Sequence, residues 1–289
     1  MSRVLAIFGP TASGKTDVAE AIAERIPATL VSADAMQVYR GLPILTNQSD
    51  RPSELVGVWP LSHEASLAEY QALAHEAIDA ALAAGRTPVV SGGTGLYLRA
   101  ALADLRLPPP PAAGARERWD AFYEEQGPVR AHAELVAVDP EAAGVVHAND
   151  RRRVVRALEL AEAGESLRPG ADRLWGGETR HPTIVVGLDV PRDELVRRIE
   201  ERTRRMIERG VVEEVRAALG EPLSATARTI HGLREFGELP LAEAVAAYDA
   251  RVRRYAAYQR KWMRRIPGIR MLDGTRPPAE LAAEILDLT

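Results

Sequence analysis

The chain has 289 residues, a formal net charge of −4 and no cysteine. It is long enough for one large core with an insertion, and the lack of cysteine excludes disulfides and thiolate metal sites. No apolar stretch is long enough to span a bilayer and no signal-peptide core is present, so we expect a soluble, cytoplasmic protein without a membrane partner. The negative charge argues against a broadly basic nucleic-acid-binding surface, and any such contact must come from local clusters.

The first predicted element is a buried strand at residues 4–8, followed by a glycine-rich loop and a helical pattern. The loop matches G-x-x-x-x-G-K-[ST], in which backbone N–H groups and the helix N-terminus bind phosphate oxygens. Lys15 adds a full charge, and the hydroxyl of Thr16 can hold Mg²⁺. The alternative is a glycine-rich helix cap that binds nothing. The expected diphosphate- or nucleotide-binding residues are Gly9, Pro10, Thr11, Ala12, Ser13, Gly14, Lys15 and Thr16.

Alternating strands and helices are predicted over the rest of the first hundred residues. We expect strands at 28–32 and 87–91, separated by a helix that begins at a Ser66–Glu69 capping box. Short apolar strands and the glycine-rich turn at 92–95 are typical of a doubly wound parallel sheet, an α/β fold like that of P-loop NTPases. Such sheets bind ligands at the carboxyl ends of their strands.

Four prolines at 108–111 predict a stiff break, after which the pattern is helical. We expect a helical insertion domain at 113–181 within a core formed by 1–112 and 182–289. The later core elements are expected in this order: a strand at 183–190, a charged helix after Pro191 that ends or kinks at Gly210, a helix at 241–265, a strand at 269–272 and a helix at 279–288.

Asp34 follows the second strand, so the topology places it in the same crevice as the phosphate loop. A carboxylate there can ligate Mg²⁺ or accept a proton from a nucleophile. It can equally cap the next turn of the chain. The residues alone leave both roles open.

Three arginine-rich clusters occur, and each is most simply a solvated helix face. The cluster at 197–205 lies among glutamates, which predicts that it pairs with itself. The cluster at 251–265 contains no acid and interleaves Tyr255, Tyr258 and Trp262, which favours contacts with a nucleic-acid strand. The remaining cluster covers 151–156.

Several blocks resemble the bacterial tRNA dimethylallyltransferases, which prenylate N6 of adenosine 37 beside the anticodon. The resemblance covers essentially the whole chain. The matching blocks are 9–16, 32–42, 92–97, 149–159 and 253–262.

The resemblance implies that the loop at 11–16 grips the diphosphate of dimethylallyl diphosphate, with Mg²⁺ near Thr16. It implies that Asp34 is the general base toward N6. Thr94 and Arg116 match family positions that contact tRNA near the reaction and complete the expected catalytic set. Whether Thr94 takes part in the chemistry or only positions the backbone stays open.

The resemblance also implies a tRNA partner held at its anticodon stem-loop by the helical insertion and the basic helix at 241–265. The family is generally monomeric. Besides Asp34, Thr94 and Arg116, the implied tRNA-binding residues are Ala35, Met36, Gln37, Arg152, Arg153, Val154, Val155, Arg156, Thr229, Ile230, His231, Gly232, Leu233 and Arg234.

Three segments depart from the family pattern and affect peripheral contacts. Residues 232–234 are Gly-Leu-Arg where the family has Gly-Tyr-Lys or Gly-Tyr-Arg. Residues 43–46 are Pro-Ile-Leu-Thr in place of Asp-Ile-Gly-Thr, and residues 59–62 are Trp-Pro-Leu-Ser where His-His-Leu is common.

Two other functions fit parts of the chain. A phosphate-loop kinase for a nucleoside or small metabolite explains residues 1–100 equally well but leaves the basic clusters at 151–156 and 251–265 without a role. A nucleotide-gated RNA-binding protein would use the loop as a switch without turnover.

Overall fold

The computed structural model describes residues 3–105, 107, 112–167 and 178–289. Its contacts divide the chain into two compact units. Unit 1 comprises Met1–Leu105 and Gly177–Thr289, and unit 2 comprises Arg106–Gly176. The prolines expected to form a stiff break lie outside the described residues.

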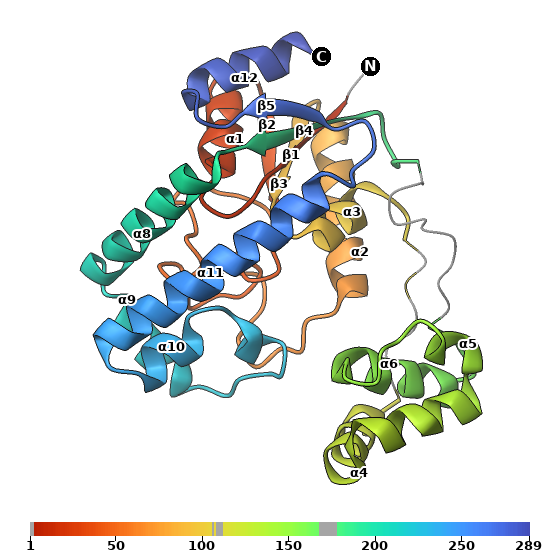
Figure 1. The fold of residues 1–289 in the computed structure, drawn as a ribbon. Helices are drawn as coiled ribbons and strands as arrows, with labels where there is room; N and C mark the ends of the chain where they lie inside the picture. Colours follow the sequence, from red (N-terminus) through yellow and green to blue (C-terminus); the bar gives the residue numbers. More distant parts are fainter. Residues whose placement is uncertain (1–2, 106, 108–111, 168–177) are drawn as a thin grey trace. The chain divides into compact units, whose positions relative to one another are not determined.

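Unit 1 is built on one sheet of five parallel strands in the order β2-β3-β1-β4-β5 (Figure 1). The β1 strand is buried along its whole length, as expected where helices cover both faces of a parallel sheet. The doubly wound sheet predicted from the sequence is therefore confirmed. The strands are β1 Val4–Phe8, β2 Ala28–Ser32, β3 Thr87–Gly92, β4 Thr183–Asp189 and β5 Arg270–Asp273.

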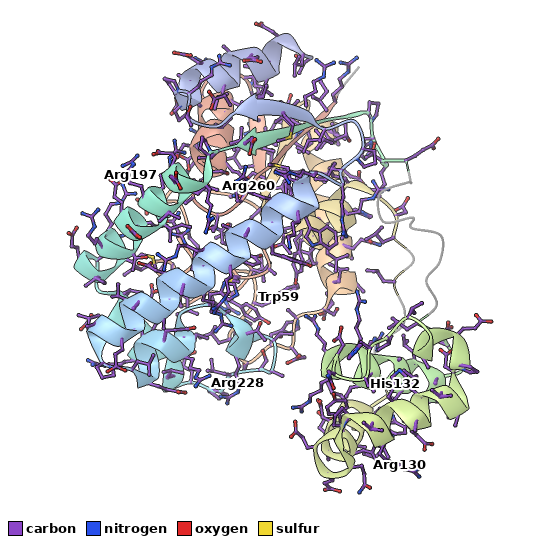
Figure 2. All side chains as sticks on the ribbon, viewed as in Figure 1. Trp59, Arg130, His132, Arg197, Arg228 and Arg260 are labelled. Atoms are coloured by element: carbon purple, nitrogen blue, oxygen red, sulfur yellow. The ribbon has the colours of Figure 1, made fainter. Side chains whose placement is uncertain are left out.

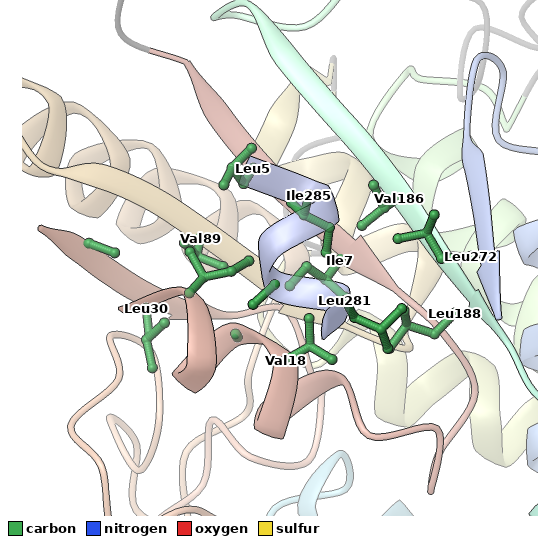
Figure 3. Packing of buried hydrophobic residues seen from close by; sticks show 14 residues of the cluster. Leu5, Ile7, Val18, Leu30, Val89, Val186, Leu188, Leu272, Leu281 and Ile285 are labelled. Atoms are coloured by element: carbon green, nitrogen blue, oxygen red, sulfur yellow. The ribbon is translucent and has the colours of Figure 1, made fainter. Parts of the chain in front are cut away.

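The first helices cover the two faces of this sheet. The chain moves from β1 to β2 in one direction and from β2 to β3 in the other, so right-handed crossovers place α1 (Lys15–Ala23) and α2 (Leu67–Ala83) on opposite faces. The last helix, α12 (Pro278–Asp287), packs beside α1, and α3 (Gly95–Leu102) packs beside α2. The core under α1 and α12 includes Leu5, Ile7, Val18, Leu188, Leu281 and Ile285 (Figure 3).

The predicted capping box at the start of α2 is confirmed. The N–H of Glu69 donates to the hydroxyl of Ser66 at 3.2 Å, and the N–H of Ser66 donates to the carboxylate of Glu69 at 3.1 Å. Two N–H groups at the helix start therefore find acceptors locally.

In the sequence, a second group of helices in unit 1 comes between β4 and β5. Gly210 has a φ of 88°, a left-handed value that separates α8 from α9, where the sequence predicted an end or kink. In a buried contact, the hydroxyl of Thr203 donates to the carboxylate of Asp249 at 2.6 Å and fixes α8 against α11. These elements are α8 Arg192–Glu208, α9 Val211–Leu219, the 3₁₀ turn η1 Ala227–Thr229, α10 Leu233–Glu238 and α11 Leu241–Met263.

Unit 2 is helical and has its own core. Gly127 interrupts α4 with non-helical backbone angles, immediately before Pro128. Its helices are α4 Ala115–Val138, α5 Pro140–Ala143 and α6 Arg151–Glu162. Its buried core includes Tyr123, Leu135, Val146, Val154, Val155 and Leu158.

The insertion expected at 113–181 differs at both ends from unit 2, which comprises Arg106–Gly176. Residues 178–181 were placed in the insertion, but they pack on unit 1. The N–H of Arg180 donates to the carbonyl of Leu102 at 2.8 Å, and the Arg180 side chain pairs with Asp79 of α2 at 2.8 Å.

Among the described residues, no helix is both long enough and apolar enough to cross a membrane.

Candidate active site

The segments that follow β2, β3 and β1, three neighbouring strands, meet at the carboxyl ends of the strands. In the parallel register, Phe8 of β1 pairs with Gly92 of β3, and Ser32 of β2 pairs with Ser91. The phosphate loop, Asp34 and Gly92 therefore line the same cavity, of about 740 Å³. The sheet order reverses direction here, which is where doubly wound sheets bind ligands.

Two glycines allow these segments to approach one another. A Cβ on Gly92 would lie 2.1 Å from the carbonyl oxygen of Ala33. A Cβ on Gly93 would lie 2.8 Å from the carbonyl oxygen of Gly9 and 2.3 Å from the side-chain nitrogen of Gln259. Any side chain at either position would therefore push the turn after β3 away from β2 and the phosphate loop.

The phosphate loop has the conformation of an anion site. Gly14 has a φ of 87°, and the helical hydrogen bonds begin with the N–H of Val18 and the carbonyl of Gly14 at 3.1 Å. The N–H groups of residues 14–17, in the first turn of α1, precede this bond and can therefore bind an anion. The Ser13 hydroxyl is buried without a hydrogen-bond partner among the described residues, which points to a missing ligand.

Lys15 lies in this loop with its ammonium group folded back onto the protein. Its Nζ donates to the carbonyl of Pro10 at 2.7 Å. Loss of hydration lowers the pKa of Lys15 to about 8, although the nearby carboxylate of Asp34 acts in the opposite direction. The group is therefore charged at neutral pH and close to Asp34.

Arg202 of α8 is a site residue that the sequence interpretation missed. Its Nη1 donates to the hydroxyl of Thr11 at 2.8 Å, and its Nε is buried without a hydrogen-bond partner among the described residues. The prediction of a self-paired cluster holds for Arg197 and Arg198, which both bind Glu194 at 2.7 Å. It is wrong for Arg202, because this side chain reaches the phosphate loop.

The spacing along α8 was the signal that could have identified this face. Arg198, Arg202, Arg205 and Arg209 recur at intervals of four, three and four residues and all line the cavity. This period places them on one side of a helix. Figure 2 shows the neighbouring Arg197 on the same helix.

Asp34 caps a turn, which is one of the two roles that the sequence left open, and it also lies at the cavity. One carboxylate oxygen, Oδ1, accepts the N–H of Met36 at 2.8 Å, so the residue does cap a turn. The carboxylate also lines the cavity and acts electrostatically on Lys15. Ala35 and Met36, which follow it, are partly buried.

The side-chain oxygen and nitrogen of Gln37 both form hydrogen bonds within the protein. Its Oε1 accepts the hydroxyl of Ser32 at 2.8 Å, and its Nε2 donates to the carbonyls of Thr46 and Asn47 at 3.2 and 3.1 Å. These bonds hold the loop at 46–47, which lines the cavity, against the end of β2.

Two of the three aromatic residues in the basic segment of α11 pack against other parts of unit 1, and their contact with a nucleic-acid strand stays a prediction. The hydroxyls of Tyr255 and Thr94 are 3.2 Å apart. The Trp262 ring packs so closely on Gly95 that a Cβ there would lie 2.6 Å from it. Of the three aromatics, Tyr258 is the most exposed, at 54%.

The acids missing from the basic segment of α11 come from other parts of unit 1. Arg251 pairs with Glu235 at 2.9 Å and Arg253 pairs with Glu200 at 3.1 Å. Arg260, labelled on α11 in Figure 2, pairs with Asp189 at 3.0 Å. Four other cations of this segment form no ion pair with any described residue: Arg254, Lys261, Arg264 and Arg265.

The segment at 229–234 contributes mainly His231 to the cavity. Its ring meets Tyr255 edge-on, with the centroids 4.8 Å apart. Burial, helped by Arg251, lowers the pKa of His231 to about 4. Ile230, Gly232 and Leu233 are buried, whereas Thr229 and Arg234 are exposed.

The structure places the remaining expected residues in unit 2. Arg116 and Arg156 both bind the carboxylate of Glu159. Arg152 and Arg153 are exposed. The side chains of Val154 and Val155 belong to the core of unit 2, so they have almost no surface to offer an RNA.

Comparisons with known proteins give consistent results. The IPP transferase family model matches residues 37–266, and the Isopentenyl transferase model matches residues 2–57. The chain is 40% identical to a tRNA dimethylallyltransferase of Streptomyces coelicolor over 94% of its own length and 90% of that protein. A Thermobifida fusca protein of the same name is also 40% identical, with coverages of 96% and 92%. The structure of a tRNA isopentenylpyrophosphate transferase from Bacillus halodurans has a TM-score of 0.70 at 29% identity, covering 100% of this chain and 95% of that one.

The fold and cavity define an α/β phosphate-loop protein whose anion site and carboxylate share one cavity. With the sequence comparisons, the assignment becomes specific. The chain belongs to the IPP transferase family, and its curated relatives are tRNA dimethylallyltransferases, which are prenyltransferases.

Proposed function

We propose that the chain transfers the dimethylallyl group of dimethylallyl diphosphate to N6 of adenosine 37 in tRNA. The observation that carries the proposal is that the phosphate loop and Asp34 line one cavity. Transfer from a diphosphate to an amine needs an anion site for the leaving group and an acceptor for the amine proton. Family membership supports the same reaction.

The transfer exchanges one bond for another. The allylic carbon–oxygen bond breaks, diphosphate keeps the electron pair, and the N6 nitrogen forms a new bond to carbon. N6 then gives up a proton, which Asp34 accepts. The backbone N–H groups of the loop, Lys15 and Arg202 stabilise the negative charge that grows on the diphosphate.

We include Mg²⁺ in this proposal. The hydroxyl of Thr16 and the carboxylate of Asp34 both line the cavity, and Mg²⁺ prefers oxygen ligands of these kinds. Within the described residues, no cluster of three His, Cys, Asp or Glu side chains could hold a metal. Oxygen atoms of the diphosphate and of water would complete the coordination of the ion. When bound, the ion would neutralise part of the leaving-group charge.

The proposed second substrate is the anticodon stem-loop of tRNA. Its target base must leave the stack to enter the cavity, which costs less in a single-stranded loop than in a duplex. Arg116 and Arg152 in unit 2 and Arg254 on α11 supply cations for phosphate contacts. We further propose that a monomer suffices, because the loop, Asp34 and Arg202 all come from one chain.

A phosphate-loop kinase would place ATP in the same loop and use Asp34 to activate a hydroxyl. The family relationship does not favour it. The decisive experiment incubates the protein with unmodified tRNA, Mg²⁺ and either dimethylallyl diphosphate or ATP. Mass spectrometry of the digested RNA should show isopentenyladenosine in the first reaction only. A phosphorylated product with ATP, and no prenylated base, would refute the proposal.

A further inference from the structure

The cavity that contains the phosphate loop also has an apolar wall. The wall consists of Leu45, Met206, Tyr248 and Val252, which line the cavity and are buried. They come from the segment between β2 and α2, from α8 and from α11. An anion site and buried apolar side chains in one cavity suit a ligand that has a charged head and a hydrocarbon chain.

Contacts join these side chains into one surface. A Cβ on Gly232 would lie 2.4 Å from Cδ1 of Leu45 and 3.0 Å from Cε2 of Tyr248, so both side chains meet at this glycine. The hydroxyl of Tyr248 lies 3.9 Å from Sδ of Met206. Val252 follows Tyr248 by one turn of α11, on the same helix face. Leu45 therefore rests on the backbone of Gly232, which has no side chain to fill the space if Leu45 is shortened.

Arg202 connects the apolar wall to the anion site. Its Nη1 donates to the hydroxyl of Thr11 at 2.8 Å. Burial raises the pKa of Tyr248, and the positive charge of Arg202 acts in the opposite direction, which places the guanidinium close to the Tyr248 hydroxyl. A hydrocarbon chain attached to a diphosphate at Arg202 therefore begins beside the wall.

We propose that Leu45 limits the length of the prenyl chain that the cavity accepts, so that a dimethylallyl chain fits and a geranyl chain, one isoprene unit longer, does not. This inference rests on the proposed function. Contact with Leu45, Met206 and Val252 removes the apolar surface of the chain from water. The adenine base suits this wall less well, because a flipped base is read by hydrogen bonds and the side chains of Leu45 and Val252 offer none.

Hydrogen bonds fix the loop that carries Leu45. Oε1 and Oε2 of Glu214 on α9 accept the N–H groups of Ile44 and Leu45 at 2.8 and 2.7 Å. The N–H of Thr46 donates to the carbonyl of Leu42 at 3.0 Å. Because its backbone is held in this way, Leu45 can make room for a longer chain only by disturbing the packing around it.

The test variant is Leu45→Ala, which removes the end of the side chain and extends the cavity toward the backbone of Gly232. Each variant is assayed with dimethylallyl diphosphate and with geranyl diphosphate, which undergo the same bond changes. We expect the ratio of kcat/KM for geranyl diphosphate to that for dimethylallyl diphosphate to rise about tenfold or more, the effect of one carbon in a hydrophobic pocket. Both substrates are measured on one preparation, so the ratio does not depend on the fraction of the variant that folds.

Leu42→Ala is the matched control. Leu42 is a buried leucine of the same loop and lies outside the cavity lining. Its variant loses the same atoms, so it should lose stability while its substrate ratio stays that of the unmodified protein. A rise of equal size in Leu42→Ala would mean that any loosening of the loop admits the longer chain, and would overturn the role of Leu45.

Leu45→Val gives a second, milder test. It shortens the side chain less, so it should raise the ratio in the same direction but by less than Leu45→Ala. An unchanged ratio in both variants, or a ratio near one in the unmodified protein, would overturn the proposal. A raised KM for tRNA with an unchanged ratio would place the adenine base against Leu45, which would also overturn it.

The two proposals fail in different ways. If the unmodified protein prenylates tRNA from dimethylallyl diphosphate and Leu45→Ala leaves the ratio unchanged, only the role of Leu45 is wrong. If the unmodified protein transfers neither group to tRNA, the proposed function is wrong as well.

Discussion

The N–H of Thr11 in the phosphate loop donates a 2.8 Å hydrogen bond to Oε1 of Gln259, which lies 248 residues later on α11. Gln259 is 2% exposed. One turn earlier on α11, the hydroxyl of Tyr255 lies 3.2 Å from that of Thr94. The helix that carries the basic segment is therefore also a wall of the cavity, and it joins the loop after β1 to the turn after β3.

We expect Gln259→Leu to raise the KM for dimethylallyl diphosphate and to lower stability. The substitution leaves the N–H of Thr11 without this acceptor, and because the bond is only partly buried the cost should lie at or below the roughly 1–3 kcal/mol of a buried group. Urea unfolding and steady-state kinetics measure the two effects. The control is Gln71→Leu, which removes a side chain that binds both backbone groups of Leu105 away from the cavity. A KM change of the same size in Gln71→Leu would contradict a specific effect on the loop.

Asp34→Asn should preserve tRNA binding and slow transfer by roughly 10²–10⁴-fold, the usual contribution of a general base. Asn keeps an oxygen that can accept the N–H of Met36, so the turn survives while the proton acceptor is lost. Asp273→Asn is the matched control, because Oδ1 of Asp273 accepts the N–H of Thr275 in the same i to i+2 geometry at the end of β5. Single-turnover rates at saturating substrates decide the question. A normal rate in Asp34→Asn would remove Asp34 as the base.

The strands and the phosphate loop could be predicted because their signals are local. A short apolar run followed by glycines gives β1 and the loop directly, and the capping box marks the start of α2. Arg202 was missed because its immediate neighbours include Glu200 and Glu201, which suggested a solvated face. Its real position depends on the contact of Thr203 with Asp249 on a helix 46 residues away.

The expected RNA-contacting residues show the same limit. A matching block cannot distinguish the side chains that reach the surface from those that support them. Val154 and Val155 lie between Arg153 and Arg156 in the sequence, yet the helical period turns both valines into the core. The pairing of Glu159 with Arg116 spans 43 residues, and only the packing of α4 on α6 reveals it.

Arg202→Ala should raise the KM for dimethylallyl diphosphate by about 10- to 100-fold, the equivalent of a charge-assisted hydrogen bond worth roughly 1.5–3 kcal/mol. The KM for tRNA should change little. Arg204→Ala is the control, because Arg204 is an exposed residue of the same helix outside the cavity lining. Binding of inorganic diphosphate by calorimetry provides a second readout. Equal affinities of the two variants would show that Arg202 does not contact the anion.

His231 should make the protein less stable in mild acid. Its pKa in the folded state is about 4, against an ordinary value of 6.5, because burial disfavours the charged ring. Between pH 6.5 and about 4 the unfolded chain binds a proton that the folded chain excludes, so the free energy of unfolding falls as the pH falls through this window. Above pH 6.5 the effect is absent. In His231→Phe an aromatic ring can still pack on Tyr255 but cannot titrate, so its free energy of unfolding should depend less on pH. Urea unfolding at pH 7.5, 6.0 and 5.0 measures the slopes, and identical slopes for the two proteins would contradict a buried neutral histidine at this position.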